Sequence, residues 1–455
     1  MTDGLAEAAR IHLVGVGGAG MSALARLLAG RGHRVTGSDA RPSPLLGALD
    51  SVGVRTWVGH DTVAMSDVDL VVASSAVPSH DPELSAARLA GAQVWDRPRL
   101  LAALTASIPT IGATGTHGKT STTAMLAVAA RAAGLDPSYV VGGVVLDLGD
   151  NGGAGRDDLL VLEVDEAFGT FEHVHLTGLV VTNVEADHLD HFGTLQGVQD
   201  AFTRVARAVD GPVLACADDP GSRSLIADAG AVGYGTADDA AWRVESLRQD
   251  EAGSRFLLVG PTRSVDVELP RPGAHMARNA AGALALLSSL GVDLEAAARG
   301  LATFRGVGRR WDVRGTVAGV TVVDDYAHHP TEIEATLDAA RRSGRRVVAV
   351  FQPHLYSRTR QHAEAFGRAL SSADVAVVLD VYGDRESPVA GIDGRLVSDA
   401  ARRVSGGVVV DAPDRASAAD VVSAVVEDGD LVVCMGAGDI TLLASELVER
   451  WRTGT

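Results

Sequence analysis

The chain has 455 residues, a net charge of −18, 46% apolar residues, 22% charged residues and 52 glycines. This length exceeds what one hydrophobic core supports and predicts two to four domains. The composition favours an α/β protein with many strand-to-helix turns and excludes a fibre or a disordered tail. The strong negative charge argues against a basic face for nucleic acid, so we expect no nucleic-acid partner.

The cysteines and the N-terminal residues indicate the cellular compartment of the protein. Cys216 and Cys434 are far apart and belong to no CxxC or Cys/His cluster, so neither a disulfide framework nor a zinc site is expected. The first twenty residues show no basic segment followed by a small-residue cleavage site, and no apolar run approaches the length of a membrane span. We therefore expect a cytoplasmic protein without a membrane partner, either a monomer or a weak homodimer.

Apolar strands and amphipathic helices alternate along the whole chain. A strand at 11–17, a helix at 21–30 and further strands at 33–39 and 69–77 predict a doubly wound domain over residues 1–106. The pattern restarts with a strand, a glycine loop and a long helix, which predicts a mostly parallel sheet in a domain over 107–310. A third α/β set follows from 320, so we expect a third domain over 311–455. The fold class is thus α/β with three domains.

The sharpest motif is ATGTHGKTSTT at 113–123, between a predicted strand and a predicted helix. Its backbone amides can hold phosphate oxygens, Lys119 can reach the β and γ phosphates, and the Thr120 hydroxyl can ligate Mg²⁺. Lys119 is the only lysine, beside 39 arginines, which indicates that a compact ammonium is required at this position. Ala113 departs from the strict phosphate-loop pattern, and the alternative is a glycine-rich turn that binds no nucleotide.

A second glycine motif, GVGGAG at 15–20, follows the first strand and has Asp39 about 20 residues beyond it, as a dinucleotide fingerprint requires. Its ligand is either NAD or another diphosphate, because any pyrophosphate can use the same helix N-terminus. Hydroxyl side chains at the ends of later strands are further candidates, with simple turn residues as the alternative. The candidate residues here are Gly17, Gly18, Ala19, Gly20, Met21, Ser38, Asp39, Ser74 and Ser75.

Acidic and histidine side chains follow two buried strands of the middle segment, in LEVDEAFGTF at 162–171 and VTNVEADHLDHFG at 181–193. Glu163 or Asp165 can hold Mg²⁺ on a nucleotide, and His188 can ligate a second ion or contact the transferring phosphoryl group. The alternative for His188 is a hydrogen-bonded loop residue.

The third segment carries DDYAHHP at 324–330 directly after a strand. Asp325 can accept from a ribose or an ammonium group, and His328 can deprotonate an amine, since only a neutral amine attacks. Arg309 in GVGRR and Arg358 in QPHLYSRTR suit phosphate or carboxylate recognition by forked donors.

Taken together, these segments resemble the Mur ligase family over nearly the whole chain. The resemblance is carried by GVGGAGMSALA, GTHGKTSTT, VTNVEADHLDHFG, FRGVGRRWD, VVDDYAHHPTEI, FQPHLYSRTR, DVYGDRESPVAG and GDLVVCMGAGDIT. It implies a Rossmann-like N-terminal domain that binds a UDP-sugar, a central ATPase and a C-terminal dinucleotide-fold domain that delivers an amino acid. The GVGGAG loop would then bind UDP and not NAD.

The resemblance also implies a reaction in peptidoglycan precursor synthesis. ATP and Mg²⁺ would convert the lactyl carboxylate of UDP-N-acetylmuramate to an acyl phosphate, which the amine of L-alanine would attack. Lys119, Glu163, His188, His328 and Arg358 would be catalytic, and Thr120, Glu163 and His188 would hold metal. ATP would contact Gly115, Thr116, His117, Gly118, Lys119, Thr120, Ser121, His275, Asn279, Arg309 and Asp325.

Three departures from the family pattern affect these assignments. An EADESD-like stretch is usual where this chain has EVDEAF, so Glu163, Asp165 and Glu166 carry over but the later serine and aspartate do not. Met276 follows His275 where an HN pair is common. A carbamylated lysine, used by some related ligases, is impossible because Lys119 is the only lysine.

Three other functions compete with this interpretation. One is a ligase that attaches a recovered peptide to the same UDP-sugar, one is an NAD-dependent oxidoreductase and one is a binding protein that takes up ATP without releasing ADP.

Overall fold

The computed structural model describes residues 5, 8–384, 386–404 and 406–454. Contacts along the chain define two compact units, and each is described by itself. Unit 1 consists of Met1–Leu247, Arg255–Leu269 and Met276–Arg305, and unit 2 consists of Arg248–Ser254, Pro270–His275 and Gly306–Thr455.

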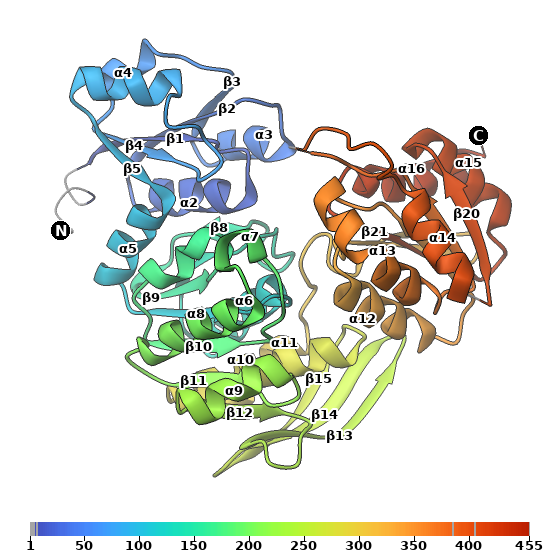
Figure 1. The fold of residues 1–455 in the computed structure, drawn as a ribbon. Helices are drawn as coiled ribbons and strands as arrows, with labels where there is room; N and C mark the ends of the chain where they lie inside the picture. The colour runs from blue at the N-terminus through green and yellow to red at the C-terminus, as the bar shows by residue number, and fades with distance from the viewer. Residues whose placement is uncertain (1–4, 6–7, 385, 405, 455) are drawn as a thin grey trace. The chain divides into compact units, whose positions relative to one another are not determined.

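The first sheet of unit 1 has five parallel strands in the order β3-β2-β1-β4-β5 (Figure 1). The strands are β1 (Arg10–Val14), β2 (Arg34–Asp39), β3 (Arg55–Val58), β4 (Leu70–Ala73) and β5 (Gln93–Asp96). The helices are α2 (Ala19–Gly30), α3 (Pro44–Asp50), η1 (Ala64–Asp67), α4 (Pro82–Ala90) and α5 (Arg97–Ser107). The strand order reverses at β1, so the loop after β1 lies where open α/β sheets bind ligands.

The second sheet has ten strands in the order β15-β14-β13-β12-β11-β10-β6-β9-β7-β8. The strands are β6 (Thr110–Thr114), β7 (Pro137–Val140), β8 (Gly152–Gly153), β9 (Arg156–Glu163), β10 (Gly178–Val181), β11 (Val213–Cys216), β12 (Val232–Gly235), β13 (Trp242–Asp250), β14 (Gly253–Val259) and β15 (Ser264–Leu269). The helices are α6 (Lys119–Ala132), η2 (Ala167–His173), α7 (Leu189–Phe192), α8 (Leu195–Arg207), α9 (Pro220–Asp228), α10 (Ala274–Ser289) and α11 (Leu294–Leu301). β6 and β10 are buried along their whole length, as apolar strands between two layers of helices must be.

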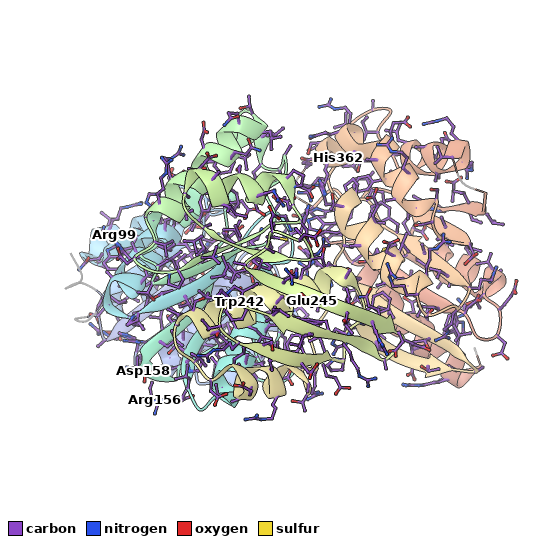
Figure 2. All side chains as sticks on the ribbon, turned by 90° about the horizontal axis from the view of Figure 1, so that it is seen from below. Arg99, Arg156, Asp158, Trp242, Glu245 and His362 are labelled. Carbon is purple, nitrogen blue, oxygen red and sulfur yellow. The ribbon has the colours of Figure 1, made fainter. Side chains whose placement is uncertain are left out.

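The strand β13 differs from these buried strands, because only Trp242 and Val244 are buried and its remaining positions alternate between partly and fully exposed. Trp242 and Glu245 both lie on it (Figure 2). Trp242 is buried against Gly260, whereas Glu245 receives hydrogen bonds from the Arg243 guanidinium. This alternation is typical of a strand with one solvated face.

The sheet of unit 2 has six strands in the order β16-β17-β21-β18-β19-β20, and only its edge strand β16 has a recorded antiparallel pairing. The strands are β16 (Asp312–Val317), β17 (Val320–Asp325), β18 (Val347–Phe351), β19 (Val375–Leu379), β20 (Val408–Ala412) and β21 (Leu431–Met435). The helices are α12 (Pro330–Arg341), α13 (Tyr356–Leu370), α14 (Arg395–Val404), α15 (Arg415–Val425) and α16 (Ile440–Thr453). Apolar clusters occupy both faces of this sheet.

The predicted α/β class is confirmed, with one sheet in each of the three predicted segments. The exact boundaries at 106/107 and 310/311 stay predictions. One continuous apolar cluster contains core residues of the first and the second sheet, such as Leu13 and Leu162, which explains why both belong to unit 1. In the part of the chain that the structure describes, no helix is both long and apolar enough to cross a membrane.

Candidate active site

The predicted phosphate loop joins β6 to α6 in unit 1. Gly115 and Gly118 have φ of +131° and +81°, which side chains other than glycine rarely adopt. A Cβ on Gly115 would also collide with Thr182 and Asn183, and one on Gly118 would touch the amide of Asn279. Asn279 is buried, so the structure places this predicted nucleotide residue directly against the loop.

Asn183 holds the loop in shape, and sequence reasoning did not select it. Its Oδ1 accepts from the His117 amide at 2.8 Å, its Nδ2 donates to the His117 carbonyl at 3.0 Å, and its own carbonyl accepts from the Thr116 amide at 3.1 Å. The amides of Thr116 and His117 are therefore already hydrogen-bonded within the protein, whereas Ser121 lies in the first turn of α6. Asn183 lies just after the buried strand β10. The same position after a strand led to the prediction of the neighbouring acidic and histidine residues, and it could have identified Asn183 as well.

Lys119 is the first residue of α6 and is held as a cation. Its Nζ donates to the carbonyls of Gly115 and Thr116 at 2.7 and 3.2 Å and to Glu166 Oε1 at 2.9 Å. Burial lowers the pKa of this amine, but the carboxylates of Glu166 and Asp165 outweigh burial and raise the pKa above its usual value. The side chain thus presents a full positive charge at the loop.

The side-chain oxygens of Thr120 and Glu163 lie next to each other. The Thr120 hydroxyl donates to Glu163 Oε1 at 3.0 Å, and the amide of Gly142 donates to Glu163 Oε2. Burial raises the pKa of Glu163, although the Gly142 hydrogen bond and Lys119 oppose that shift. A hydroxyl beside a carboxylate that lacks a full counter-charge fits a hard divalent cation such as Mg²⁺.

His188 lies near this group without a close bond to it. Its Nε2 is 3.9 Å from Glu166 Oε1, and its backbone has a φ of +52°, which is unusual for a residue with a side chain. His275 lies one helical turn before Asn279 on α10. Five of the predicted residues therefore lie around the phosphate loop, each in contact with the loop, with another of the five or with Glu166: Lys119, Thr120, Glu163, His188 and Asn279. His275 belongs to unit 2.

The glycine loop after β1 lies at the edge where the first sheet reverses its order. The amide of Gly17 donates to Asp39 Oδ2 at 2.9 Å, so Asp39 braces the loop. Gly15 has a φ of +83° and packs against Ser74, while Ser75 is exposed beside it. Gly18 caps α2, and the first turn of that helix holds Ala19, Gly20 and Met21. The Met21 side chain is buried, so only its backbone amide can serve a ligand.

Ser38 requires a correction. We expected its hydroxyl to contact a ligand, but the side chain is only 1% exposed and donates to Glu83 Oε2. Its carbonyl accepts from the amides of Gly15 and Val16 at 2.8 and 3.0 Å. Ser38 therefore supports the glycine loop from behind, because the burial of its hydroxyl leaves no room for a direct contact.

Residues that follow β7 in the second sheet also support the glycine loop after β1. Asn151 is 1% exposed and donates to the Ala19 carbonyl at 2.7 Å and to the Ser22 hydroxyl at 2.9 Å, both in the first turn of α2. Arg26, also on α2, forms an ion pair with Asp150 at 3.0 Å. Neither contact was predicted, since nothing in the sequence shows that residues 150–151 return to α2.

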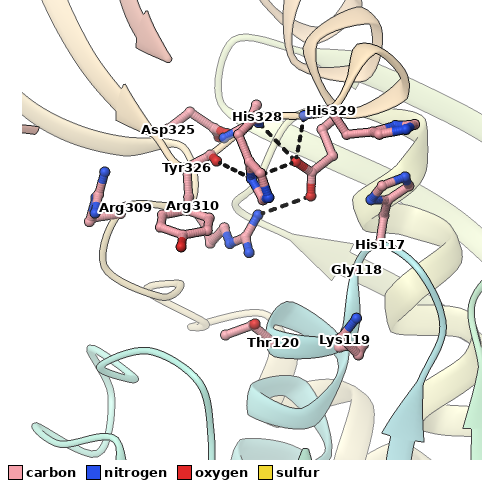
Figure 3. A network of polar contacts seen from close by, with 12 residues as sticks. His117, Gly118, Lys119, Thr120, Arg309, Arg310, Asp325, Tyr326, His328 and His329 are labelled. Atoms are coloured by element: carbon pink, nitrogen blue, oxygen red, sulfur yellow. Dashed lines mark hydrogen bonds and ion pairs between the residues drawn. The ribbon is translucent and has the colours of Figure 1, made fainter. Parts of the chain in front are cut away.

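In unit 2, the DDYAHHP segment forms a polar network at the end of β17. Figure 3 shows His328, His329 and Arg310 around one carboxylate, that of Glu332, which accepts from the amides of His328 and His329 and pairs with Arg310 at 3.5 Å. His328 Nδ1 is 2.9 Å from the Tyr326 carbonyl and 3.2 Å from Glu332. Two acceptors at Nδ1 assign the proton to that atom and leave Nε2 as an acceptor.

Asp325 is buried and accepts from the amides of Trp311 and Ala327, each at 2.8 Å. Burial raises its pKa to about 6, although Arg310 opposes the shift.

Arg309 donates to the carbonyls of Gly436 and Gly438 at 2.8 and 3.1 Å and stacks on Tyr326 at 4.8 Å. The guanidinium of Arg309 thus stabilises the loop after β21, and its predicted contact with ATP stays a prediction. Arg358 lies in the first turn of α13.

The comparison with known families agrees with this arrangement. The model of the Mur ligase family catalytic domain matches residues 10–108, that of the Mur ligase middle domain matches 113–287 and that of the Mur ligase glutamate ligase domain matches 309–438. A UDP-N-acetylmuramate-L-alanine ligase from Kineococcus radiotolerans is 48% identical over 460 residues, covering 98% of this chain and 97% of that protein. This chain belongs to the Mur ligase family.

Two solved structures resemble this Mur ligase to different degrees. The UDP-N-acetylmuramate-alanine ligase of Thermotoga maritima superposes with a TM-score of 0.84 and 29% identity, covering 98% of this chain and 100% of that one. A murein peptide ligase from Psychrobacter arcticus gives a TM-score of 0.69 and 25% identity, covering 97% and 98%. The alanine ligase is thus the more similar of the two.

Proposed function

We propose that this Mur ligase uses ATP to join L-alanine to the lactyl carboxylate of UDP-N-acetylmuramate, forming ADP and phosphate, in the synthesis of peptidoglycan precursors. The relatives that match it end to end supply the identity of the substrates. The observation that carries the proposal is the group Lys119, Thr120 and Glu163, in which the end of β9 meets the start of α6, because it provides what phosphoryl transfer needs.

The first step transfers the γ-phosphoryl group of ATP to the lactyl carboxylate. A carboxylate oxygen forms a bond to phosphorus while the bond from phosphorus to the ADP oxygen breaks, and the product is an acyl phosphate. Lys119 offers its charge to the phosphate oxygens and must leave Glu166 to do so. The exchange of one anionic partner for another keeps the buried ammonium paired throughout.

Mg²⁺ fits the oxygen pair formed by Thr120 and Glu163, and we propose these two residues as its ligands. When bound, the ion would neutralise phosphate charge. His188 is proposed to approach the phosphoryl group from the side of Glu166.

The second step forms the amide. The neutral amine of alanine attacks the acyl carbon, the bond from that carbon to the phosphate oxygen breaks, and the nitrogen loses a proton. We assign the proton acceptor to His328 Nε2, since its Nδ1 is engaged by Tyr326 and Glu332. Arg358 is proposed to hold the carboxylate of the amino acid.

The substrates are small molecules, and ATP and nucleotide sugars are cytoplasmic compounds, so we place the enzyme in the cytoplasm. The two cysteines are free and buried, which is compatible with that compartment. A monomer or weak homodimer stays a prediction, which sedimentation velocity would check.

The test is phosphate release with ATP, Mg²⁺ and UDP-N-acetylmuramate, comparing L-alanine, L-serine, glycine and a stem tripeptide, with the product mass measured. We expect release that requires both the UDP-sugar and alanine, and an amide product. Release only with the tripeptide would make the chain a peptide-recycling ligase. Binding of ATP without ADP formation would leave a binding protein, and NADH binding that UDP does not displace would indicate an oxidoreductase.

A further inference from the structure

Arg97 is the first residue of α5, and its guanidinium covers the glycine loop of the first sheet. A Cβ added to Gly20 would lie 3.0 Å from Nη2, 3.1 Å from Cζ and 3.5 Å from Nη1 of Arg97. The guanidinium therefore lies directly against Gly20, and a side chain at this position would displace it. The last glycine of the GVGGAG motif thus allows the cation to approach the backbone of the loop closely.

The guanidinium has no anionic partner among the residues that the structure describes. Its Nε is buried and has no hydrogen-bond acceptor. By contrast, Arg10 forms an ion pair with Asp69 and Arg26 forms one with Asp150. A buried donor without an acceptor is unfavourable, and an anion bound beside Arg97 would supply that acceptor.

Two helix N-termini add to the positive potential at this place. The amides of Ala19, Gly20 and Met21 open α2 and have no acceptor in the described part of the chain, as is usual for a first turn. Arg97 itself opens α5. The nearby carboxylates are already used, because Asp39 accepts from Gly17 and Asp96 accepts from the Arg99 amide. The surroundings thus favour an anion.

We propose that Arg97 binds the diphosphate of the UDP-sugar, with its guanidinium and the first-turn amides of α2 around the same phosphate oxygens. This inference rests on the proposed function and adds a residue from the far end of the domain to the glycine loop. A guanidinium suits the task because its fork can donate two parallel hydrogen bonds to one phosphate.

The test compares Arg97→Ala and Arg97→Lys with a matched control, Arg99→Ala. Arg99 lies two residues further on the same helix, is exposed and stacks on Trp95 at 4.4 Å (Figure 2). Calorimetric titration with UDP, UMP and uridine should show UDP binding weakened by about 10- to 100-fold in Arg97→Ala, since a charged hydrogen bond contributes about 1.5–3 kcal/mol. Uridine binding should be unchanged, UMP should be less affected than UDP, and Arg97→Lys should be intermediate.

Equal UDP affinity in Arg97→Ala and Arg99→Ala would overturn the inference, as would an equal loss for UDP and uridine. If Arg97→Ala does not fold, Gly20→Ala replaces it, because the added methyl group displaces the guanidinium; unchanged UDP affinity in that variant would also contradict the proposal. A native chain that binds no UDP would refute the proposed function itself, whereas a loss confined to Arg97→Ala leaves alanine-dependent ligation standing at saturating UDP-sugar.

Discussion

Unit 1 contains two glycine loops with the same local design and different surroundings. Each follows a buried strand and opens a helix, at Gly15–Gly20 and at Gly115–Gly118. In the loop after β6, the cation Lys119 already has a carboxylate partner and Asn183 occupies two amides. At the loop after β1, the buried Nε of the cation Arg97, which opens α5, has no hydrogen-bond acceptor among the described residues.

This difference distinguishes a loop suited to phosphoryl transfer from a loop suited to binding alone. A loop that transfers a phosphoryl group must hold its charge in a fixed place, so its lysine is kept in position by Glu166 until the nucleotide replaces that carboxylate. A loop that only holds a diphosphate needs unmatched donors that the ligand can satisfy. Backbone amides that open a helix are present in both cases, and residues from other parts of the domain distinguish the two loops.

The largest expected effect is that of Lys119→Ala, which removes the charge from the loop after β6. Turnover should fall by about 10²- to 10³-fold, the usual cost of one lost transition-state donor, while the affinity for UDP stays unchanged. Steady-state phosphate release and UDP titration measure the two quantities.

The control for that variant is Arg131→Ala on the same helix, a residue in the last turn of α6 that stacks on Tyr139. It should keep near-normal turnover. A Lys119→Ala protein with near-normal turnover, or one that has also lost UDP binding, would break the distinction between the two loops.

The next effect concerns the support of the loop after β1. Glu83 is fully buried, and although burial raises its pKa, hydrogen bonds from His12, the Asp61 amide and Ser38 outweigh burial and lower the pKa to about 2. A carboxylate with a folded pKa below its unfolded value of about 4.3 stabilises the fold above that pH and loses the contribution as pH falls toward 2. Glu83→Gln should therefore cost ~2 kcal/mol at pH 7 and little at pH 2.

Urea unfolding at several pH values measures this difference. Because Ser38 links Glu83 to the amides of Gly15 and Val16, the variant should also bind UDP more weakly without a change in the KM for ATP. A stability loss of equal size at pH 2 and pH 7 would contradict the assignment of the charge.

The smallest effect is expected for Asn183→Ala. Loss of its side-chain bonds to the His117 amide and carbonyl should lower kcat/KM for ATP by about tenfold, since each such bond contributes about 1 kcal/mol. The KM for the UDP-sugar should not move. Gln199→Ala, on the outer part of α8, provides a control that should leave both constants unchanged.

Much of this account was readable from the sequence. The strands before each glycine loop and the helices after them follow from local patterns. The rule that ligands gather at strand ends selected Glu163 or Asp165 beside the phosphate loop, and the structure pairs Thr120 with Glu163. Arg97 and Asn151 were not predictable in this way. Their importance depends on which segments become neighbours in three dimensions, and in the sequence Arg97 is one arginine among 39. Ser38 misled the prediction because a serine at a strand end looks the same whether its hydroxyl faces a ligand or a buried carboxylate.

The central claim, that ATP activates a carboxylate for ligation, is tested most directly with UDP-N-acetylmuramate carrying ¹⁸O in its lactyl carboxylate. Formation and aminolysis of an acyl phosphate transfer one carboxylate oxygen to the phosphate that is released. We predict one ¹⁸O in each phosphate formed together with the alanine amide. Phosphate without the label would show that water attacks ATP directly and would contradict the proposed ligation.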